Sequence, residues 1–305
     1  MPSSSAEPPG SSSPSRVTRI EIPVETRAPT GTTNAYLVDG VLVDPAAVTD
    51  ELDAAIERIG PNAVDAVAVT HTHPDHVGGV ATYAESTGAT VYAHADGVDR
   101  FRERTGVDPD ATFRDGSTLG ETDVSVLETP GHAPDHVAFA VDGDGDAVDG
   151  DGNDADSDGN AVDGGSDDAD GDGNDADNAP SELLCGDLAV AEGSVVVGAP
   201  EGNMTDYLDS LERVQQGGFD RLYPGHGPVI ENPQATCQRL IDHRLERERS
   251  VLAAVESGAT DIEGVIEAAY QKDLTGVEDL ARATVQAHLQ KLVDAGDIAE
   301  QWAQK

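Results

Sequence analysis

A six-residue segment with three imidazoles constrains this chain more than any other part of its sequence. The segment is His71-Thr72-His73-Pro74-Asp75-His76, and it follows an apolar run in which Val64, Val67 and Val69 predict a buried strand. Histidine and carboxylate side chains packed this closely predict a metal site at the end of that strand, with zinc favoured and iron or manganese as the alternatives. A polar loop with incidental histidines is disfavoured, because the chain has only nine histidines and three of them fall within this segment.

Three further segments end in a side chain that can bind a metal ion. His132 follows an apolar run through a Thr-Pro-Gly sequence, and Asp187 follows the run Leu-Leu-Cys-Gly. His226 stands in the sequence Tyr-Pro-Gly-His-Gly. Each of these residues comes directly after a short segment that predicts a strand. We therefore expect four strand ends to direct His or Asp side chains to one place.

The order of these residues resembles the metal-binding motifs of the metallo-β-lactamase superfamily. HxHxDH is followed by a His after Pro-Gly, an Asp after a small residue and a His in a Gly-His-Gly turn, and the match spans residues 16–230. The resemblance implies an α/β (α+β) fold, a four-layer αββα sandwich in which two mixed sheets lie between outer helices. It also implies a two-metal site whose ligands are His71, His73 and His132 for one ion, Asp75, His76 and His226 for the other, and Asp187 as the bridge.

The bridging position also bears on the reaction. The true class B lactamases carry a Cys there, whereas this chain has Asp187, which argues against a penicillin-degrading role. The resemblance implies two divalent metal ions, zinc before iron or manganese, that generate a bound hydroxide as the nucleophile. Asp75 is a candidate catalytic residue, because its carboxylate could orient that nucleophile or pass a proton to the leaving group.

Three polar residues near the predicted ligands have two interpretations each. His136 lies four positions after His132, a spacing that resembles the thioesterase branch of the superfamily and several of its nucleases. It is the second candidate catalytic residue, and a buried histidine bonded to a backbone carbonyl is the alternative. His94 ends a predicted strand, either at the rim of the site or in an ordinary surface role. Asn34 either faces the site or forms a turn.

The cysteines and the N-terminus bear on the cellular compartment. The chain has two cysteines, which do not make a disulfide framework or a zinc ribbon. Cys185 is predicted to be a small apolar core residue, and Cys237 falls in a predicted helix. Residues 1–15 are rich in Ser and Pro, which predicts disorder, and they lack the features of a signal peptide. No apolar run is long enough to span a bilayer. We expect a cytoplasmic protein without a membrane partner. Whether it forms a homodimer is left open by the sequence.

The chain is strongly acidic, with 18 Lys and Arg against 59 Asp and Glu and a net charge of −41. Residues 142–178 contain fifteen Asp and no Glu, Lys or Arg, yet the rest of the chain still carries −26. Acidity spread over the whole chain indicates a halophilic protein, because salt at 1 M screens charges within about 3 Å. The repetitive segment 142–180 predicts a disordered acidic insertion. Residues 154–159 resemble the start of an EF-hand calcium loop, but Gly165 stands where such a loop has its calcium-binding Glu. A solvated loop is therefore favoured over a calcium site.

The C-terminal region, residues 231–305, differs from the predicted sandwich. A linker helix, two shorter helices and a short wing fit its pattern, which is that of a winged-helix-like domain. Such domains suggest DNA binding, but residues 236–305 contain eight Lys and Arg against thirteen Asp and Glu, so a basic face for phosphates is missing. This argument is weaker in a halophile, where all surfaces are acidic. The segments are 232–256 for the linker helix, 262–266 and 281–292 for the two helices and 296–298 for the start of the wing.

The last motif and this region together resemble the branch of the superfamily that contains beta-lactamase-like protein two, a metal-dependent endoribonuclease. The resemblance rests on residues 223–232 and 241–248, and it covers nearly the whole chain outside residues 1–15 and the acidic insertion. It implies that the added domain walls one side of the active-site cleft. His243, Arg244 and Arg247 could therefore face the substrate; ion pairs on the surface of the helix are the alternative.

These observations predict a metal-dependent hydrolase, with two interpretations of its substrate. The first is single-stranded RNA, whose cleavage requires a long groove and cations that bind phosphates. The alternative is a small-molecule ester or thioester, as in the hydroxyacylglutathione hydrolase branch. A winged-helix regulator with a relic hydrolase domain is the non-enzymatic alternative. We disfavour it, because every predicted ligand position is filled.

Overall fold

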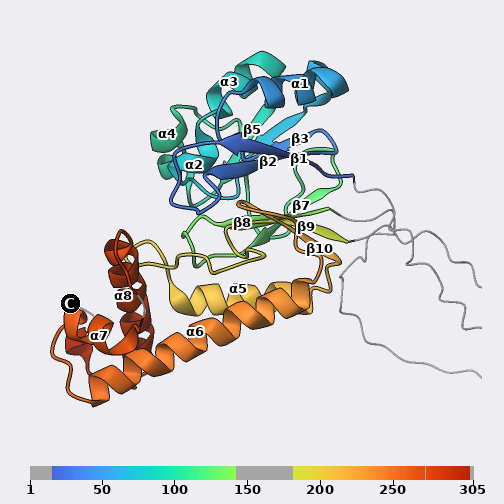
Figure 1. Cartoon of the computed structure of the whole chain (residues 1–305). Coiled ribbons are helices and arrows are strands. Elements are labelled where there is room, and N and C mark those ends of the chain that lie inside the picture. The colour runs from blue at the N-terminus through green and yellow to red at the C-terminus, as the bar shows by residue number, and fades with distance from the viewer. Residues whose placement is uncertain (1–15, 142–180, 272, 303–305) are drawn as a thin grey trace, which may run out of the picture.

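The computed structural model describes residues 16–141, 181–271 and 273–302. Within these residues the chain forms two mixed β-sheets that face each other, with helices on the outer side of each sheet (Figure 1). The expected four-layer αββα sandwich is thereby confirmed. The predictions of a disordered N-terminus and of a disordered, solvated acidic insertion concern residues 1–15 and 142–180, which lie outside the described residues.

The first sheet comes from the N-terminal half of the chain and has the strand order β1-β2-β3-β4-β5-β6. Neighbouring strands from β1 to β3 pair antiparallel, and those from β3 to β6 pair parallel. The parallel strands share one edge for their carboxyl ends, and the segment with the three imidazoles leaves β4 at that edge. The strands are β1 (Thr18–Pro23), β2 (Thr32–Val38), β3 (Val41–Val43), β4 (Ala66–Ala68), β5 (Thr90–His94) and β6 (Ala111–Phe113).

The second sheet has the strand order β10-β9-β8-β7. β8 pairs antiparallel with both β7 and β9, and β9 pairs parallel with β10. The strand that leaves the His132 turn and the strand that leads to Asp187 thus form an antiparallel pair, in which Val141 lies opposite Glu182. The strands are β7 (Val124–Glu128), β8 (Val137–Val141), β9 (Glu182–Gly186) and β10 (Arg221–Pro224).

Alternating side chains in the strands divide the sandwich core into three layers. In β2, Tyr36 belongs to the core between the sheets, and Leu37 belongs to the core under the outer helices of the first sheet. The core outside the second sheet includes Cys185 and Cys237, which are buried free cysteines as expected for core residues. The outer helices are α1 (Asp50–Ile59), α3 (Val80–Thr87) and α4 (Val98–Thr105) on the first sheet and α5 (Met204–Gln216) and α6 (Pro233–Glu256) on the second.

Local sequence signals set the ends of these helices. Thr49 caps α1 by accepting a hydrogen bond from the backbone N–H of Leu52, and Asn203 caps α5 in the same way. The predicted long linker helix is α6, which begins after the cap Asn232. Among the helices in the described ranges, none combines the length and apolar character that a bilayer crossing requires. The remaining short elements of the sandwich are η1 (Pro61–Ala63) and α2 (Pro74–Val77).

The C-terminal module consists of the end of α6 together with α7 (Ile262–Ala269), α8 (Glu278–Asp294) and η2 (Glu300–Trp302). These helices enclose a core of their own, in which Val285 and Leu289 pack with Trp302. The expectation of a short wing is wrong for residues 296–302, because this segment forms η2 and contains no strand. The indole of Trp302 is only 5% exposed, and burying so large a ring in a helical core favours the turn over an exposed wing.

Candidate metal centre

The seven predicted metal ligands come together at one end of the sandwich, where α2 lies (Figure 1). Each follows the carboxyl end of a strand, and strands from both sheets contribute. The sequence therefore identified a set of side chains that the fold does gather at one place. They are His71, His73, Asp75 and His76 after β4, His132 after β7, Asp187 after β9 and His226 after β10.

The first group of ligands consists of His71, His73 and His132, whose inward nitrogens lie within 4.8 Å of one another. Nδ1 of His73 is 3.0 Å from Nε2 of His71 and 2.9 Å from Nε2 of His132. Burial lowers the pKa of His132 to about 4, and burial together with the neighbouring imidazoles lowers the pKa of His71. Both rings are thus neutral near pH 7 and have a lone pair available for a metal ion.

The second group consists of Asp75, His76 and His226. Nε2 of His226 lies 3.6 Å from Oδ2 of Asp75. The carboxylate of Asp187 stands between the two groups: its Oδ2 is 3.5 Å from Nε2 of His132 and 3.4 Å from Nε2 of His226. Its Oδ1 is 3.7 Å from Nε2 of His76. Asp187 therefore contacts ligands of both groups, as a bridging ligand must.

The donor set fits two divalent metal ions. Nε2 of His76 and Oδ1 of Asp187 are buried and have no hydrogen-bond partner in the described part of the chain. An unsatisfied buried polar group costs about 1–3 kcal/mol, and a bound cation would satisfy both atoms. Imidazole and carboxylate donors suit zinc, iron or manganese. The residues present are consistent with the expected pair of divalent ions.

Each ligand histidine is held through the ring nitrogen that faces away from its group. Such contacts fix the tautomer and the orientation of a metal-binding imidazole. Two of the acceptors are backbone carbonyls, and the others are side chains. The contacts are His71 Nδ1 to Thr70 Oγ1 (3.1 Å), His73 Nε2 to Glu201 Oε2 (3.1 Å), His76 Nδ1 to Asp44 Oδ2 (2.9 Å), His132 Nδ1 to the Val196 carbonyl (2.6 Å) and His226 Nδ1 to the Thr32 carbonyl (2.8 Å).

Asp44 is a site residue that the sequence analysis missed. It is fully buried at the end of β3 and accepts hydrogen bonds from the backbone N–H and the hydroxyl of Thr70, both at 2.7 Å. Burial lowers the pKa of His76, but the charge and hydrogen bond of Asp44 outweigh it and raise that pKa to about 9. The sequence did contain a signal for Asp44. Like the predicted ligands, it is a polar side chain that follows a short apolar run, here Val41–Val43.

Close packing explains the two Pro-Gly-His sequences. A Cβ atom on Gly225 would lie 2.4 Å from Oδ1 of Asp187. Gly131 has a φ of +127°, and a Cβ there would lie 2.3 Å from the backbone nitrogen of Tyr207 in α5. Only glycine allows the backbone to come this close to its neighbours while the next residue, a ligand histidine, turns inward.

His136 does not have the catalytic position that the sequence analysis gave it. Its side chain is 1% exposed, and both ring nitrogens contact the backbone. Nδ1 donates to the carbonyl of Thr129 over 2.9 Å, and Nε2 accepts from the N–H of Asp187 over 3.0 Å. With both nitrogens occupied, His136 positions Asp187 rather than exchanging protons with a substrate.

The other two polar residues near the ligands also have structural roles. Asn34 is buried, and its amide donates to the carbonyls of Pro224 and Gly227, both at 2.8 Å, so it braces the turn that carries His226. His94 lies outside the ligand groups, with Nε2 3.0 Å from a carboxylate oxygen of Glu128.

Two arginines of α6, Arg244 and Arg247, bind backbone carbonyls of the protein. Arg244 is 3% exposed and donates to the carbonyl of Val195, beside the residue that holds His132. Arg247 donates to the carbonyl of Ala269 and stacks on Tyr270, with the guanidinium carbon 3.8 Å from the ring centroid. The expectation that these two residues face the substrate is wrong, because Arg244 binds a carbonyl of the connection between β9 and α5 and Arg247 binds a carbonyl of the C-terminal module. His243, the third residue of that expectation, is half-buried on the same helix.

A cavity of about 660 Å³ has no ligand residue in its lining but adjoins the first group through Gly131, which precedes His132, and through Glu201, which contacts His73. It is formed by the turn of Gly131, by residues 199–206 and by α8. Glu201, which holds His73, belongs to its lining. Lys291 is the one basic side chain among the described residues that line it, and it pairs with Glu248 over 2.7 Å. The acidic side chains of the lining are Glu201, Asp206 and Asp294.

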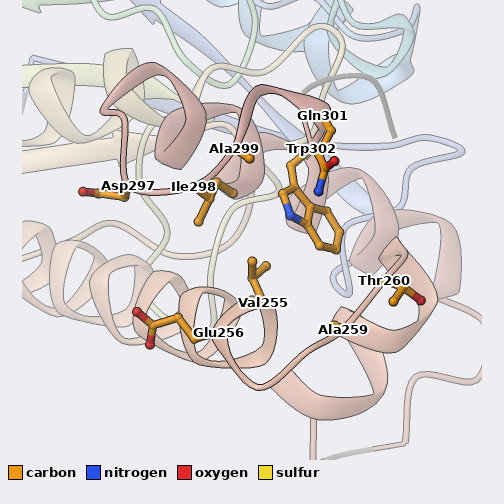
Figure 2. Close-up of a pocket in the computed structure, with 9 residues that line it drawn as sticks. All are labelled: Val255, Glu256, Ala259, Thr260, Asp297, Ile298, Ala299, Gln301 and Trp302. Atoms are coloured by element: carbon orange, nitrogen blue, oxygen red, sulfur yellow. The ribbon is translucent and has the colours of Figure 1, made fainter.

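A second cavity, of about 500 Å³, lies within the C-terminal module (Figure 2). Its lining includes Val255, Ile298 and Trp302, together with the acidic residues Glu256 and Asp297. Its lining contains neither a ligand residue nor a sequence neighbour of one, so it is separate from the metal centre. Trp302 lines both cavities.

Comparison with known protein families assigns the chain to a superfamily. The profile of the Metallo-beta-lactamase superfamily matches residues 28–226, which is more than half of the chain. The protein therefore belongs to the metallo-β-lactamase superfamily, and its fold and its His/Asp cluster make it a metal-dependent hydrolase of that superfamily.

Three curated relatives are similar to most of the chain. Two are named Beta-lactamase-like protein 2 homolog, from Drosophila melanogaster (26% identical, 77% of this chain and 70% of the relative) and from Caenorhabditis elegans (25%, 73% and 65%). A third is an atrochrysone carboxyl ACP thioesterase from Aspergillus fumigatus (26%, 74% and 60%). The chain thus spans about two thirds of the length of these relatives.

Two solved structures share the fold over nearly the whole chain. A metallo-beta-lactamase family protein from Thermus thermophilus has a TM-score of 0.65 at 23% identity, with 93% of this chain and 95% of that chain covered. A beta-lactamase domain protein from Burkholderia ambifaria has a TM-score of 0.67 at 18% identity, with 93% and 87% covered. Because 93% of this chain is covered in both cases, the shared fold includes part of the C-terminal region as well as the sandwich.

Proposed function

We propose that the chain hydrolyses a small-molecule ester or thioester at the centre formed by the seven ligands. The observation that carries this proposal is the cavity of about 660 Å³ whose lining, although it contains no ligand, includes Gly131 beside His132 and Glu201, which contacts His73. Pockets of roughly 300–1,000 Å³ are typical of sites for small molecules. A relative that shares 26% identity is named as an acyl carrier protein thioesterase, which also supports a thioester as substrate.

The charges at the cavity favour RNA as the substrate less than they favour a small ester or thioester. One lysine, already paired with Glu248, faces three carboxylates in the lining. Arg244 and Arg247 contact carbonyls inside the protein. A polyanion that gains affinity from phosphate contacts with Lys and Arg would find few of them at this cavity. RNA cleavage is the second candidate, supported by the similarity to the two beta-lactamase-like protein 2 homologs.

The side chains have separate roles in the proposed reaction. When bound, the two metal ions supply a nucleophile at neutral pH and polarise the scissile carbonyl. His71, His73 and His132 would hold one ion, Asp75, His76 and His226 the other, and Asp187 both. The hydroxyl of Thr26 donates to Oδ2 of Asp75 over 2.5 Å, which fixes this carboxylate beside His226. We assign Asp75 the transfer of a proton to the leaving group.

The test is a comparison of substrates under one set of conditions. The full chain, purified in high salt and loaded with zinc or manganese, is assayed with an aromatic acyl thioester, an aromatic ester, a labelled single-stranded RNA and a cephalosporin. We expect kcat/KM to be highest for the ester or thioester. Asp187→Asn, which keeps the shape of the side chain and removes the bridging charge, should abolish that turnover.

Two outcomes would overturn the proposal. RNA cleavage that disappears in Asp187→Asn, without ester or thioester turnover in the parent, would establish the second candidate. A parent protein that binds two metal ions and cleaves none of the four substrates would show that the cavity serves a different compound.

A further inference from the structure

Glu201 joins the metal centre to the loop before α5. Its Oε2 lies 3.1 Å from Nε2 of His73 and 3.0 Å from Nη2 of Arg100. His73 presents Nδ1 to the first ligand group, so Nε2 is the nitrogen that faces away from it. A carboxylate at that position fixes the tautomer that carries its proton on Nε2 and orients the ring.

Arg100 connects Glu201 with the ligand segment itself. Its Nε donates to the hydroxyl of Thr72 over 2.7 Å, and that hydroxyl donates to Oδ2 of Asp135 over 2.6 Å. Thr72 stands between the ligands His71 and His73 in the sequence. The contacts of Arg100 therefore fix the carboxylate of Glu201 relative to the backbone that carries both histidines.

The loop that carries Glu201 rests directly on α8. The backbone N–H of Ala199 donates to the carbonyl of Ala283 over 3.1 Å, and Gly202 closes the loop by donating to the carbonyl of Gly198 over 2.8 Å. A Cβ atom on Gly198 would lie only 2.7 Å from Cβ of Ala283. The position of this loop thus depends on α8, an element of the C-terminal module.

We propose that Glu201 is a positioning residue for His73, and that α8 sets the place of Glu201 through its contact with Gly198. The C-terminal module then controls how tightly the first ligand group binds its metal ion. This role concerns metal affinity and does not depend on whether the substrate is an ester, a thioester or RNA.

The first experiment measures zinc affinity by competition with a coloured chelator, using the full chain after its metal has been removed. Glu201→Ala should weaken one of the two binding steps by about 10–100-fold and leave the other unchanged. Glu201→Gln should lie between the parent and Glu201→Ala, because its amide oxygen still accepts from His73 without the charge. Glu192→Ala is the matched control, because Glu192 is an exposed Glu in the same connection between β9 and α5.

A spectroscopic measurement separates positioning from a general loosening of the loop. In cobalt-loaded protein, Glu201→Ala should change the visible absorption of one of the two ions, whereas the melting temperature of the metal-free form should stay close to that of the parent. Unchanged zinc affinity and an unchanged cobalt spectrum in Glu201→Ala would overturn the proposal. A loss of both binding steps together would also overturn it, since the contact with His73 concerns one group.

The second experiment tests the role of α8 with a pair of compensating changes. Gly198→Ala creates a clash with Cβ of Ala283 and should weaken the same zinc-binding step as Glu201→Ala. Ala283→Gly removes that atom and leaves the backbone carbonyl carbon of residue 283 as the nearest neighbour of the new methyl group, at 3.5 Å. The double variant should therefore recover the parent affinity. If Gly198→Ala binds zinc like the parent, the module does not control this site.

Discussion

The backbone N–H of Asp187 donates a hydrogen bond to Nε2 of His136 over 3.0 Å. Burial lowers the pKa of His136 to about 3, so its ring is neutral near pH 7 and Nε2 can accept this bond. The same ring donates to the carbonyl of Thr129, at the end of β7. His136 therefore ties the bridging ligand to the strand that leads to His132.

Replacing His136 with Ala should lower the free energy of unfolding by about 1–3 kcal/mol, because the N–H of Asp187 loses its acceptor in a buried place. Its effect on zinc affinity should be smaller than that of His132→Ala, which removes a ligand atom. Denaturant titration and metal analysis measure the two effects. Equal losses of zinc in the two variants would make His136 a ligand.

Asp187→Asn should reduce the metal content from about two ions per chain to about one or fewer, because the bridging carboxylate contacts ligands of both groups. Elemental analysis of the dialysed protein measures this content. Asp209→Asn is the control, since Asp209 is exposed on α5. A full complement of two ions in Asp187→Asn would contradict the bridging role.

Arg244→Met should lower the free energy of unfolding by about 1.5–3 kcal/mol, because it removes a buried charged donor to the carbonyl of Val195. Arg249→Met, on the exposed side of the same helix, should have almost no effect. Denaturant titration of both variants gives the comparison. A variant of Arg244 with parental stability and weakened RNA binding would restore the interpretation that this residue faces a substrate.

His288 should make the C-terminal module sensitive to acid. Burial lowers its pKa below the ordinary value of about 6.5, although the nearby carboxylate of Glu248 acts in the opposite direction. Between its lowered pKa and about pH 6.5, His288 is protonated in the unfolded chain but not in the folded chain. The contribution of His288 to the stability of the fold is therefore complete above about pH 6.5 and falls as the pH decreases. His288→Leu should remove this part of the dependence. The comparison uses unfolding of the metal-free parent and variant between pH 5 and 7, and parallel curves would show that His288 has no part in it.

Replacing residues 142–179 with a two-residue Asn-Gly turn should leave turnover nearly unchanged. Val141 and Glu182 pair at the end of β8 that lies away from His136, about 17 Å along a five-residue strand. The variant loses fifteen Asp, so we expect a lower solubility or a shifted salt optimum. A large fall in turnover with two metal ions still bound would show that this part of the chain reaches the active site.

The ligands could be predicted from the sequence because they follow a local rule. Each is a His or Asp in the turn that follows a short apolar strand, and several of them share one six-residue segment. The side chains that hold the ligands follow no such rule. Glu201 is 128 positions from His73, and Thr32 is 194 positions from His226. Only the folded chain brings these pairs together.

Errors in the C-terminal region have a common physical cause. The periodicity of apolar residues predicted its helices, but it gives no information on which way a long polar side chain turns. Arg244 and Arg247 carry charges and were expected at a surface, yet each donates to a backbone carbonyl of another segment of the protein. The wing was expected from its place after two helices, and the burial of Trp302 favoured η2 instead.

The pair Val141 and Glu182 lies at the end of the sandwich opposite the metal centre. We expect the two ends to tolerate sequence changes differently. At one end, a single added methyl group on Gly131 or Gly225 would collide with its neighbours. At the other end, an aspartate-rich segment of the sequence connects the paired strands β8 and β9. We therefore expect changes of charge and hydration at this junction to leave the chemistry unaltered, and the same junction is a suitable place to insert an affinity tag or a fluorescent reporter.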